Sequence, residues 1–142
     1  MRKTILLPAT MALAVLLASG VALAANVQGT GGDDVLYGTG FRDTIIPFGG
    51  DDTVYALAGN DDVRHSFGND TIYGGADNDT LRGGRGSDVI YGGRGKDLID
   101  CAWLATRAGD EEDTAYYTPG QDTVVDCKTK LTPDPTDTKS TL

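Results

Sequence analysis

The sequence predicts an all-β fold, a parallel β-solenoid built from nine-residue repeats. Between Gly29 and Asp100 the 142-residue chain divides into eight consecutive nine-residue blocks with no insertion. Position six of every block is aspartate, and position eight is always aliphatic. A fixed period repeats one local structure, so the blocks should stack into a single elongated domain. A disordered, acidic, glycine-rich segment would explain the composition but not the in-phase aliphatic residues.

Each block should form a turn followed by a short strand. Positions one to six are rich in Gly, Asn and Asp, which favour turns. Positions seven to nine are stretches such as Val35-Leu36-Tyr37, which favour strands whose middle side chain faces inward. Two blocks return the chain to its starting side, so successive coils should build two parallel sheets. The core between the sheets then consists of the position-eight residues Leu36, Ile45, Val54, Val63, Ile72, Leu81, Ile90 and Ile99.

Residues 1–24 have the layout of a secretory signal peptide. Arg2 and Lys3 precede an apolar run that ends in Ala22-Leu23-Ala24, with small residues at alternate positions. Cleavage would produce a secreted, extracellular chain that begins near Ala25. The alternative is an uncleaved membrane anchor, because the apolar stretch approaches the length that spans a bilayer.

The charge of the chain indicates which partners it favours. The chain has 21 Asp and Glu against 12 Lys and Arg, a net charge of −9. An acidic surface disfavours nucleic acid and, once the leader is removed, anionic membranes as partners, and it favours cations.

The repeat phase breaks after Asp100 and then resumes weakly. Residues 101–107 form an insertion, and two degenerate blocks follow at 108–116 and 117–125. Their position-six residues are Asp113 and Asp122.

Residues 101–127 should form a cap over the last coil of a domain that spans residues 25–127, because the last core layer of a solenoid would otherwise meet water. In an exported chain, Cys101 and Cys127 should form one disulfide that closes this cap; the alternative is two unpaired thiols. Residues 128–142 are polar and rich in Pro, Thr and Asp, so we expect a disordered tail.

The blocks resemble the nonapeptide GGxGxDxUx of the repeats-in-toxin (RTX) family, the haemolysin-type calcium-binding repeats. The match is closest in GGRGSDVIY (Gly83–Tyr91) and GGRGKDLID (Gly92–Asp100). The resemblance implies a right-handed parallel β-roll that binds calcium ions between the turns of successive coils, each turn pairing with the one two blocks later.

The resemblance also implies a set of calcium ligands: the position-six carboxylates, helped by main-chain carbonyls of their own turns. The implied carboxylates belong to Asp34, Asp43, Asp52, Asp61, Asp70, Asp79, Asp88 and Asp97, and the implied turn glycines are Gly32, Gly50, Gly59, Gly68, Gly86 and Gly95. The early blocks depart from the pattern, since Pro47-Phe48, Ala56-Leu57 and His65-Ser66 replace the opening glycines. Phe41 stands at position four, where we expect a left-handed conformation that a bulky residue resists. Calcium sites in these turns should therefore be weaker, the one in block two most of all.

The chemistry of the turns favours Ca²⁺ over other metals. Oxygen ligands in flexible, glycine-rich turns suit Ca²⁺, whereas Mg²⁺ requires a tighter octahedron and zinc prefers His or Cys. The core is thin and the stacked carboxylates should repel each other, so folding should be coupled to Ca²⁺ binding.

Other candidate functions have weaker support. Position nine places Tyr37, Tyr55, Tyr73 and Tyr91 on one outer face, either as a sheet-stabilising row or as a binding strip of an adhesion or glycan-binding module with purely structural calcium. His65 is the only histidine and is expected to be an exposed turn residue. The chain carries no catalytic constellation that we recognise, so we expect a calcium-binding protein that is not an enzyme.

Overall fold

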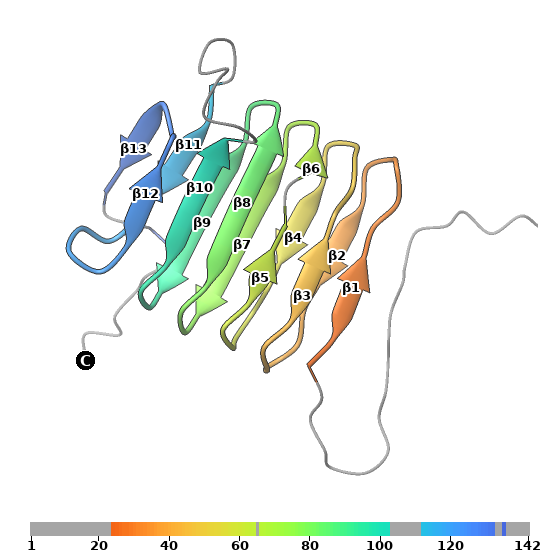
Figure 1. The fold of residues 1–142 in the computed structure, drawn as a ribbon, viewed down its shortest axis with the longest axis horizontal. Coiled ribbons are helices and arrows are strands. Elements are labelled where there is room, and N and C mark those ends of the chain that lie inside the picture. The colour runs from red at the N-terminus through yellow and green to blue at the C-terminus, as the bar shows by residue number, and fades with distance from the viewer. Residues whose placement is uncertain (1–23, 65, 103–111, 133–134, 136–142) are drawn as a thin grey trace, which may run out of the picture.

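The chain forms a parallel β-solenoid of two sheets (Figure 1), as the nine-residue period predicts. The computed structural model describes residues 24–64, 66–102, 112–132 and 135. These residues contain no helix that is long and apolar enough to span a membrane. The predicted signal peptide, except Ala24, lies outside the described residues, as do His65 and Trp103.

Thirteen strands, all paired in parallel, make up the two sheets. The seven-stranded sheet contains β1 (Asn26–Gln28), β3 (Thr44–Ile46), β5 (Asp62–Val63), β6 (Ser66–Phe67), β8 (Thr80–Arg85), β10 (Leu98–Ala102) and β12 (Thr123–Val125). The six-stranded sheet contains β2 (Val35–Tyr37), β4 (Thr53–Tyr55), β7 (Thr71–Ala76), β9 (Val89–Arg94), β11 (Thr114–Tyr116) and β13 (Thr129–Leu131).

The register of both sheets confirms the coil of two blocks. Leu36 pairs with Val54, and Val54 with Ile72, so that each position-eight residue lies over its equivalent in the next coil. All eight predicted core residues are buried, with exposed fractions of 5% or less. The aliphatic column between the sheets is therefore the core that the period predicts.

The N-terminal end and the strand lengths differ from the sequence-based expectation. Residues 26–28 belong to the solenoid as β1, which pairs with β3 and buries Val27 at position eight of a preceding half-coil. Strands β7, β8 and β9 run three residues past position nine into the following turn. Glycines at positions one and two permit this extension, since Gly75 and Gly93 take φ values of 107° and 90° and pair with each other.

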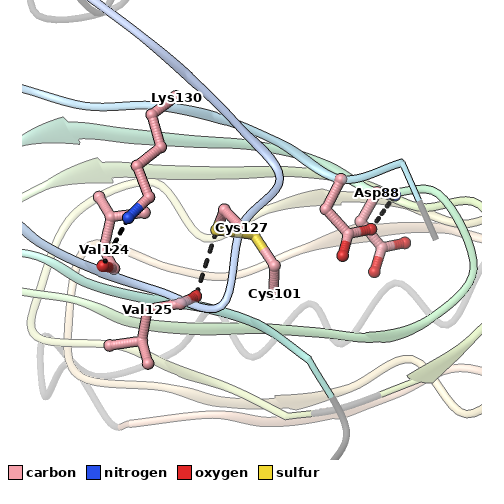
Figure 2. Close-up of a disulfide and its surroundings, with 7 residues drawn as sticks. Asp88, Cys101, Val124, Val125, Cys127 and Lys130 are labelled. Atoms are coloured by element: carbon pink, nitrogen blue, oxygen red, sulfur yellow. Dashed lines mark hydrogen bonds between the residues drawn. A yellow bond between two sulfur atoms is a disulfide. The ribbon is translucent and has the colours of Figure 1, made fainter. Parts of the chain in front are cut away.

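The degenerate blocks continue the solenoid as a further coil. Val89 pairs with Thr114 and Leu98 with Thr123, so the seven-residue insertion is absorbed without a change of register. The predicted disulfide between Cys101 and Cys127 is present, with a Cα–Cα distance of 5.1 Å (Figure 2). The described part of the predicted cap thus takes the form of a coil tied back to β10.

The predicted tail begins with ordered structure. The composition of residues 128–142 predicts a disordered tail, but Thr129–Leu131 form strand β13 and pair with β11. The open edge of β11 explains this difference, because unpaired strand-edge groups favour pairing even with polar segments. Lys130 Nζ also donates to the Val124 carbonyl oxygen at 3.3 Å (Figure 2).

The outer faces of the two sheets carry different side chains. On the six-stranded sheet, Tyr37, Tyr55, Tyr73, Tyr91 and Tyr116 stack in one row, with ring-centroid distances between 4.5 and 5.1 Å. Tyr116 extends the row that the sequence predicts. Stacked aromatic neighbours of this kind stabilise adjacent strands.

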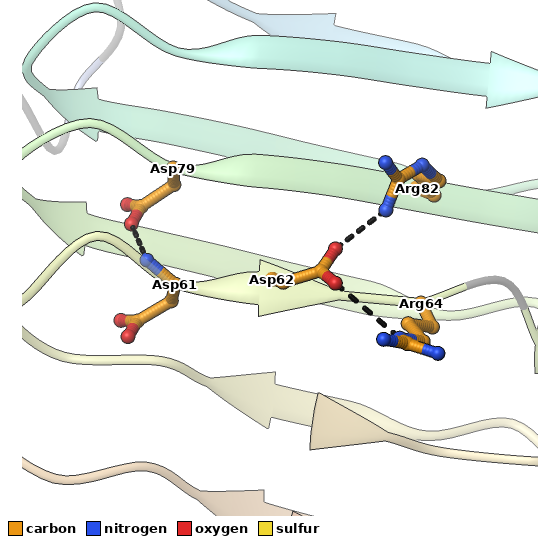
Figure 3. A network of polar contacts seen from close by, with 5 residues as sticks. All are labelled: Asp61, Asp62, Arg64, Asp79 and Arg82. Atoms are coloured by element: carbon orange, nitrogen blue, oxygen red, sulfur yellow. Dashed lines mark hydrogen bonds and ion pairs between the residues drawn. The ribbon is translucent and has the colours of Figure 1, made fainter. Parts of the chain in front are cut away.

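A charged group occupies the opposite face, on the seven-stranded sheet (Figure 3). Arg82 Nη1 contacts Asp62 Oδ1 at 2.5 Å, and Arg64 Nε contacts the other oxygen of the same carboxylate at 3.3 Å. The Arg82–Asp62 pair joins the neighbouring strands β8 and β5, whereas the Arg64–Asp62 pair lies within one segment; ion pairs on such a partly solvated surface contribute modestly to stability.

The core register generates a first prediction. Ile72→Asp should destabilise the protein in millimolar Ca²⁺ by at least roughly 3 kcal/mol, because it places an unpaired carboxylate between the sheets. Thr71→Asp is the matched control, since position seven faces outward and is half-buried. Denaturant unfolding followed by circular dichroism provides the measurement. An equal loss of stability in both variants would mean that the assigned inward face is wrong.

The disulfide generates a second prediction. Replacing Cys101 and Cys127 together by serine should lower the free energy of unfolding by ~3–4 kcal/mol, because the bond closes a loop over a sequence separation of 26 residues. The comparison is between this variant and the wild type in denaturant at saturating Ca²⁺. An unchanged unfolding midpoint would show that the cross-link does not constrain the unfolded chain.

Candidate metal centre

The position-six aspartates lie where each turn enters its strand, and their side chains are drawn into the interior. The residues Asp43, Asp52, Asp61, Asp70, Asp79, Asp88 and Asp97 are buried, with exposed fractions of 2% or less. Asp34, in the first turn, is half-buried. Blocks alternate between the sheets, so the turns form two columns, one along each edge of the solenoid.

One carboxylate oxygen of each of the seven buried aspartates joins it to the preceding coil. The Asp61 amide donates to Asp79 Oδ1 at 2.9 Å (Figure 3), and the Asp79 amide donates to Asp97 Oδ1 at 2.9 Å. The same bond joins Asp52 to Asp70 at 2.8 Å and Asp70 to Asp88 at 2.9 Å. Each turn therefore pairs with the turn two blocks later, as the sequence analysis expects.

The second carboxylate oxygen has a different environment in several turns. Oδ2 of Asp52, Asp61 and Asp79 is buried and has no hydrogen-bond partner among the described residues. An unsatisfied buried carboxylate oxygen is costly, and a native structure retains one only where something else compensates. These atoms are therefore the strongest indication of a ligand site in the fold.

Burial makes the charged form of these carboxylates unfavourable. It raises the pKa of Asp52 and of Asp61 from 3.8 to about 6, although an amide hydrogen bond partly opposes the rise. It raises the pKa of Asp79 to about 8, with smaller contributions from the negative charges of Asp97, Asp61 and Asp77. Burial thus favours the protonated form of Asp79 at neutral pH, and that of Asp52 and Asp61 below about pH 6.

Main-chain oxygens converge on the same space as the carboxylate. A Cβ placed on Gly74, at position one, would lie 2.7 Å from Asp79 Oδ2 and 2.5 Å from the Gly92 carbonyl oxygen of the next coil. Gly29 and Gly38 in blocks one and two have similar oxygen neighbours, whereas Pro47 and Ala56 at position one of blocks three and four carry side chains, which are buried. The turn of block six therefore has an oxygen-lined space beside its carboxylate that a side chain at position one would restrict.

The predicted turn glycines form two stacked columns at position four. A Cβ on Gly50, Gly68 or Gly86 would collide with the carbonyl group of the position-four residue one coil earlier. Gly50, Gly68 and Gly86 have φ values of 106°, 125° and 127°. Gly59 and Gly95 occupy equivalent positions in the other column, with φ values of 114° and 144°. Only glycine fits these positions without strain.

The expectation for Phe41 is wrong. Neither Phe41 nor Gly32, the position-four residues of the first coil, is among the positive-φ residues. Phe48 and Leu57, at position two, take φ values of 77° and 82° instead. The sequence analysis noted that these two residues replace glycines but did not identify position two as left-handed.

Two further features were missed as parts of the site. Asp113 and Asp122 repeat the position-six role, because their Oδ1 atoms accept the amides of Asp88 and Asp97 at 2.9 and 3.0 Å. Each lies 25 residues after the aspartate whose amide it accepts, which equals two nine-residue blocks plus the seven-residue insertion, and this spacing was the available signal.

A second ladder runs along position five. Asp51 Oδ1 accepts the Asn69 amide at 2.8 Å, Asn69 Oδ1 accepts the Ser87 amide at 2.9 Å, and Asn78 Oδ1 accepts the Lys96 amide at 2.8 Å. The recurrence of Asp and Asn at position five indicates this ladder in the sequence. It joins adjacent turns through amide hydrogen bonds, and the charges of Asp33 and Asp51 help to raise the pKa values of Asp52 and Asp70.

The comparison with protein families agrees with this geometry. The model of the RTX calcium-binding nonapeptide repeat matches in four copies, over residues 28–63 and 66–99. The chain belongs to the RTX calcium-binding repeat family. A comparison with curated proteins and one with solved structures find no significant match.

The residues of this RTX chain fit a calcium ion. No group of three or more His, Cys, Asp or Glu side chains that could hold a metal is found in the described ranges. A calcium site in these ranges would therefore need main-chain oxygens as well as carboxylates. Carboxylate and carbonyl oxygens in a turn of this kind match the preference of Ca²⁺.

The raised pKa values generate a third prediction. Folded pKa values of about 6 and about 8 exceed the unfolded value of 3.8, so the metal-free folded state holds protons that the unfolded state releases. This stabilisation is complete below pH ~4 and is lost as the pH rises through ~6 to ~8. Protein stripped of divalent ions should therefore show more β-structure by circular dichroism at pH 5 than at pH 8.

Asn variants separate the buried group from general charge effects. Asp79→Asn should weaken the loss of structure between pH 6 and 8, because its side chain does not ionise. Asp126→Asn removes an exposed carboxylate by the same substitution and should retain that loss. A wild-type spectrum that is constant from pH 5 to pH 8 without metal would contradict the assignment.

Proposed function

We propose that this RTX repeat protein is a secreted calcium-binding β-roll whose folding is coupled to Ca²⁺ binding. The single observation that supports it best is the set of buried carboxylate oxygens without hydrogen-bond partners at Asp52, Asp61 and Asp79. Calcium-binding repeats and a parallel β-solenoid are the context in which these atoms occur.

The ligands would come from two neighbouring turns. The position-six carboxylates would bind the ion through their inward oxygens, and main-chain carbonyls of the glycine turns would complete the oxygen set. In block six, Asp79 Oδ2 and the Gly92 carbonyl oxygen border the same space, so they are the first such pair to test. A bound Ca²⁺ supplies positive charge that makes the ionised form of these carboxylates favourable.

Coupling to folding follows from charge and chain entropy. Adjacent coils lie ~4.8 Å apart, and at an effective dielectric constant near 20 two ionised carboxylates at that spacing would repel by roughly 3 kcal/mol. The glycine-rich turns also lose much backbone entropy on folding. A site made from two coils barely exists in the unfolded chain, so its binding energy contributes to folding.

The remaining parts of the proposal rest on sequence. The leader-like residues 1–24 support export, and an extracellular environment would supply calcium at millimolar concentration. The binding role requires no catalytic group, and we propose that the protein is not an enzyme.

The glycan-binding alternative is less favoured by the geometry of the tyrosine row. The rings of Tyr55 and Tyr73 stack with an interplanar angle of 2°, and those of Tyr73 and Tyr91 with an angle of 6°. Ring faces that stack on each other are not available to stack on a sugar. The row therefore supports the sheet-stabilising interpretation.

The proposal predicts that calcium addition folds the protein. The chain lacking residues 1–24 should be largely disordered in chelator and become β-rich when Ca²⁺ is added, with half-saturation around 10⁻⁴–10⁻³ M. Circular dichroism during a titration provides the measurement, with Mg²⁺ as the ionic control. A spectrum that is β-rich in chelator and unchanged by millimolar Ca²⁺ would contradict the proposal.

The calcium affinity of each site should depend on the residues of its turn. Asp88→Ala and Asp97→Ala should each raise the Ca²⁺ concentration at half-saturation more than Asp43→Ala does. The carboxylate of Asp43 is already bonded by the Thr39 amide and hydroxyl, at 2.5 and 2.9 Å from Oδ2. The opposite ranking would overturn the assignment of the stronger sites to the C-terminal blocks.

A further inference from the structure

Hydroxyl side chains at position two distinguish some turns from the rest. Thr30 Oγ1 donates to Asp34 Oδ2 at 2.9 Å, and Thr39 Oγ1 contacts both oxygens of Asp43, at 2.9 and 3.0 Å. Ser66 Oγ donates to Asp70 Oδ2 in the same way. In each case the hydroxyl comes from the residue four positions before the aspartate. We call these three turns the closed turns.

The turns without this hydroxyl leave the same atom unsatisfied. Position two is Phe48, Leu57 and Gly75 in the blocks that contain Asp52, Asp61 and Asp79. The Oδ2 atoms of those three aspartates are buried and have no hydrogen-bond partner in the described part of the chain. We call these the open turns. The two kinds of turn differ at a single carboxylate oxygen, since Oδ1 is bonded to the preceding coil in both Asp43 and Asp79.

The backbone conformation at position two also differs between the open turns and the two closed turns that contain threonine. Phe48, Leu57 and Gly75 take φ values of 77°, 82° and 107°, whereas Thr30 and Thr39 are not among the positive-φ residues. In the two threonine turns the position-two amide also donates to Oδ2, at 2.6 Å for Thr30 and 2.5 Å for Thr39. A closed turn with threonine at position two thus satisfies its carboxylate with two local donors.

We propose that the position-two hydroxyl replaces a bound cation in the closed turns, so that Ca²⁺ is taken up by turns that lack this hydroxyl, the three open turns among them. This inference rests on the proposed function and names the turns in which that function operates. A carboxylate that accepts two or three hydrogen bonds is stabilised as an anion. A bound Ca²⁺ would stabilise the anion in the same way in an open turn. The closed turns would then fold without metal.

The order of the turns gives the array a direction. Closed turns occupy both edges of the first coil, at Thr30 and Thr39. On one edge, the open turn of Asp52 is followed by the closed turn of Asp70, in which Ser66 supplies the hydroxyl. On the other edge the open turns of Asp61 and Asp79 are adjacent, joined by the bond from the Asp61 amide (Figure 3). The first coil would provide a metal-independent end on which calcium-dependent coils assemble.

Glycine and serine variants at one position test the inference directly. Thr39→Gly removes the hydroxyl and permits the positive φ of an open turn, whereas Thr39→Ser keeps the hydroxyl and is the matched control. Equilibrium dialysis at saturating Ca²⁺ should find one more bound ion per chain in Thr39→Gly than in the wild type, and the wild-type number in Thr39→Ser. Thr39→Gly should also have less β-structure than Thr39→Ser in chelator, and Ca²⁺ should remove that difference.

A second variant guards against failure of the first to fold. Ser66→Gly opens a turn on the other edge and should also gain one ion. If wild type takes up Ca²⁺ but both glycine variants bind the wild-type number, or fail to fold at saturating Ca²⁺, the inference is overturned and the proposed function stands. If wild type takes up no Ca²⁺, the proposed function fails and the inference fails with it.

Discussion

The structure depends on one carboxylate per block, held away from water at the point where a turn becomes a strand. Its first oxygen joins the turn to the preceding coil through an amide hydrogen bond, as Asp79 does to Asp61. Its main-chain carbonyl joins it to the following coil, as Asp79 does to Leu98. The position-six aspartate is therefore a structural joint as well as a candidate ligand. Burying its negative charge is unfavourable, so the coil needs a hydrogen-bond donor or a cation beside the carboxylate.

Two kinds of partner are available to this charge. In the turns of Asp34, Asp43 and Asp70, local hydroxyl groups donate hydrogen bonds to the carboxylate. The carboxylates of Asp52, Asp61 and Asp79 each retain one oxygen without a hydrogen-bond partner among the described residues. The position-five ladder and the tyrosine row stabilise the stack in both kinds of coil, because neither is formed by the buried carboxylates. The fold thus combines hydrogen-bonded and stacked interactions with turns in which one buried carboxylate oxygen has no hydrogen-bond partner among the described residues.

The sequence predicted the parts of the fold that depend on period. A nine-residue phase with one inward aliphatic residue determines the coil, the register and the core, and these were confirmed from Leu36 to Ile99. The pairing of turns two blocks apart follows from the same geometry. The insertion after Asp100 was also identified, because Thr114 and Thr123 resume the phase.

The remaining features depend on single residues rather than on the period. Position two is left-handed at Leu57 but not at Thr39, whose hydroxyl bonds the carboxylate of Asp43. Composition alone does not reveal this difference. Strand β13 forms from a polar segment because it finds an open edge, which is a tertiary effect. The burial of Asp79 likewise results from stacking, and only the folded coil raises its pKa to about 8.

The central claim is that calcium binding and folding are one process in this chain. The temperature dependence of the calorimetric enthalpy of Ca²⁺ binding tests it most directly, because burying apolar surface lowers the heat capacity. Coupled folding of the solenoid predicts a heat-capacity change on the order of −1 kcal/mol/K, as expected when a domain of about 100 residues folds. A change close to zero, with Ca²⁺ still bound, would show that the sites are preformed and would contradict the account.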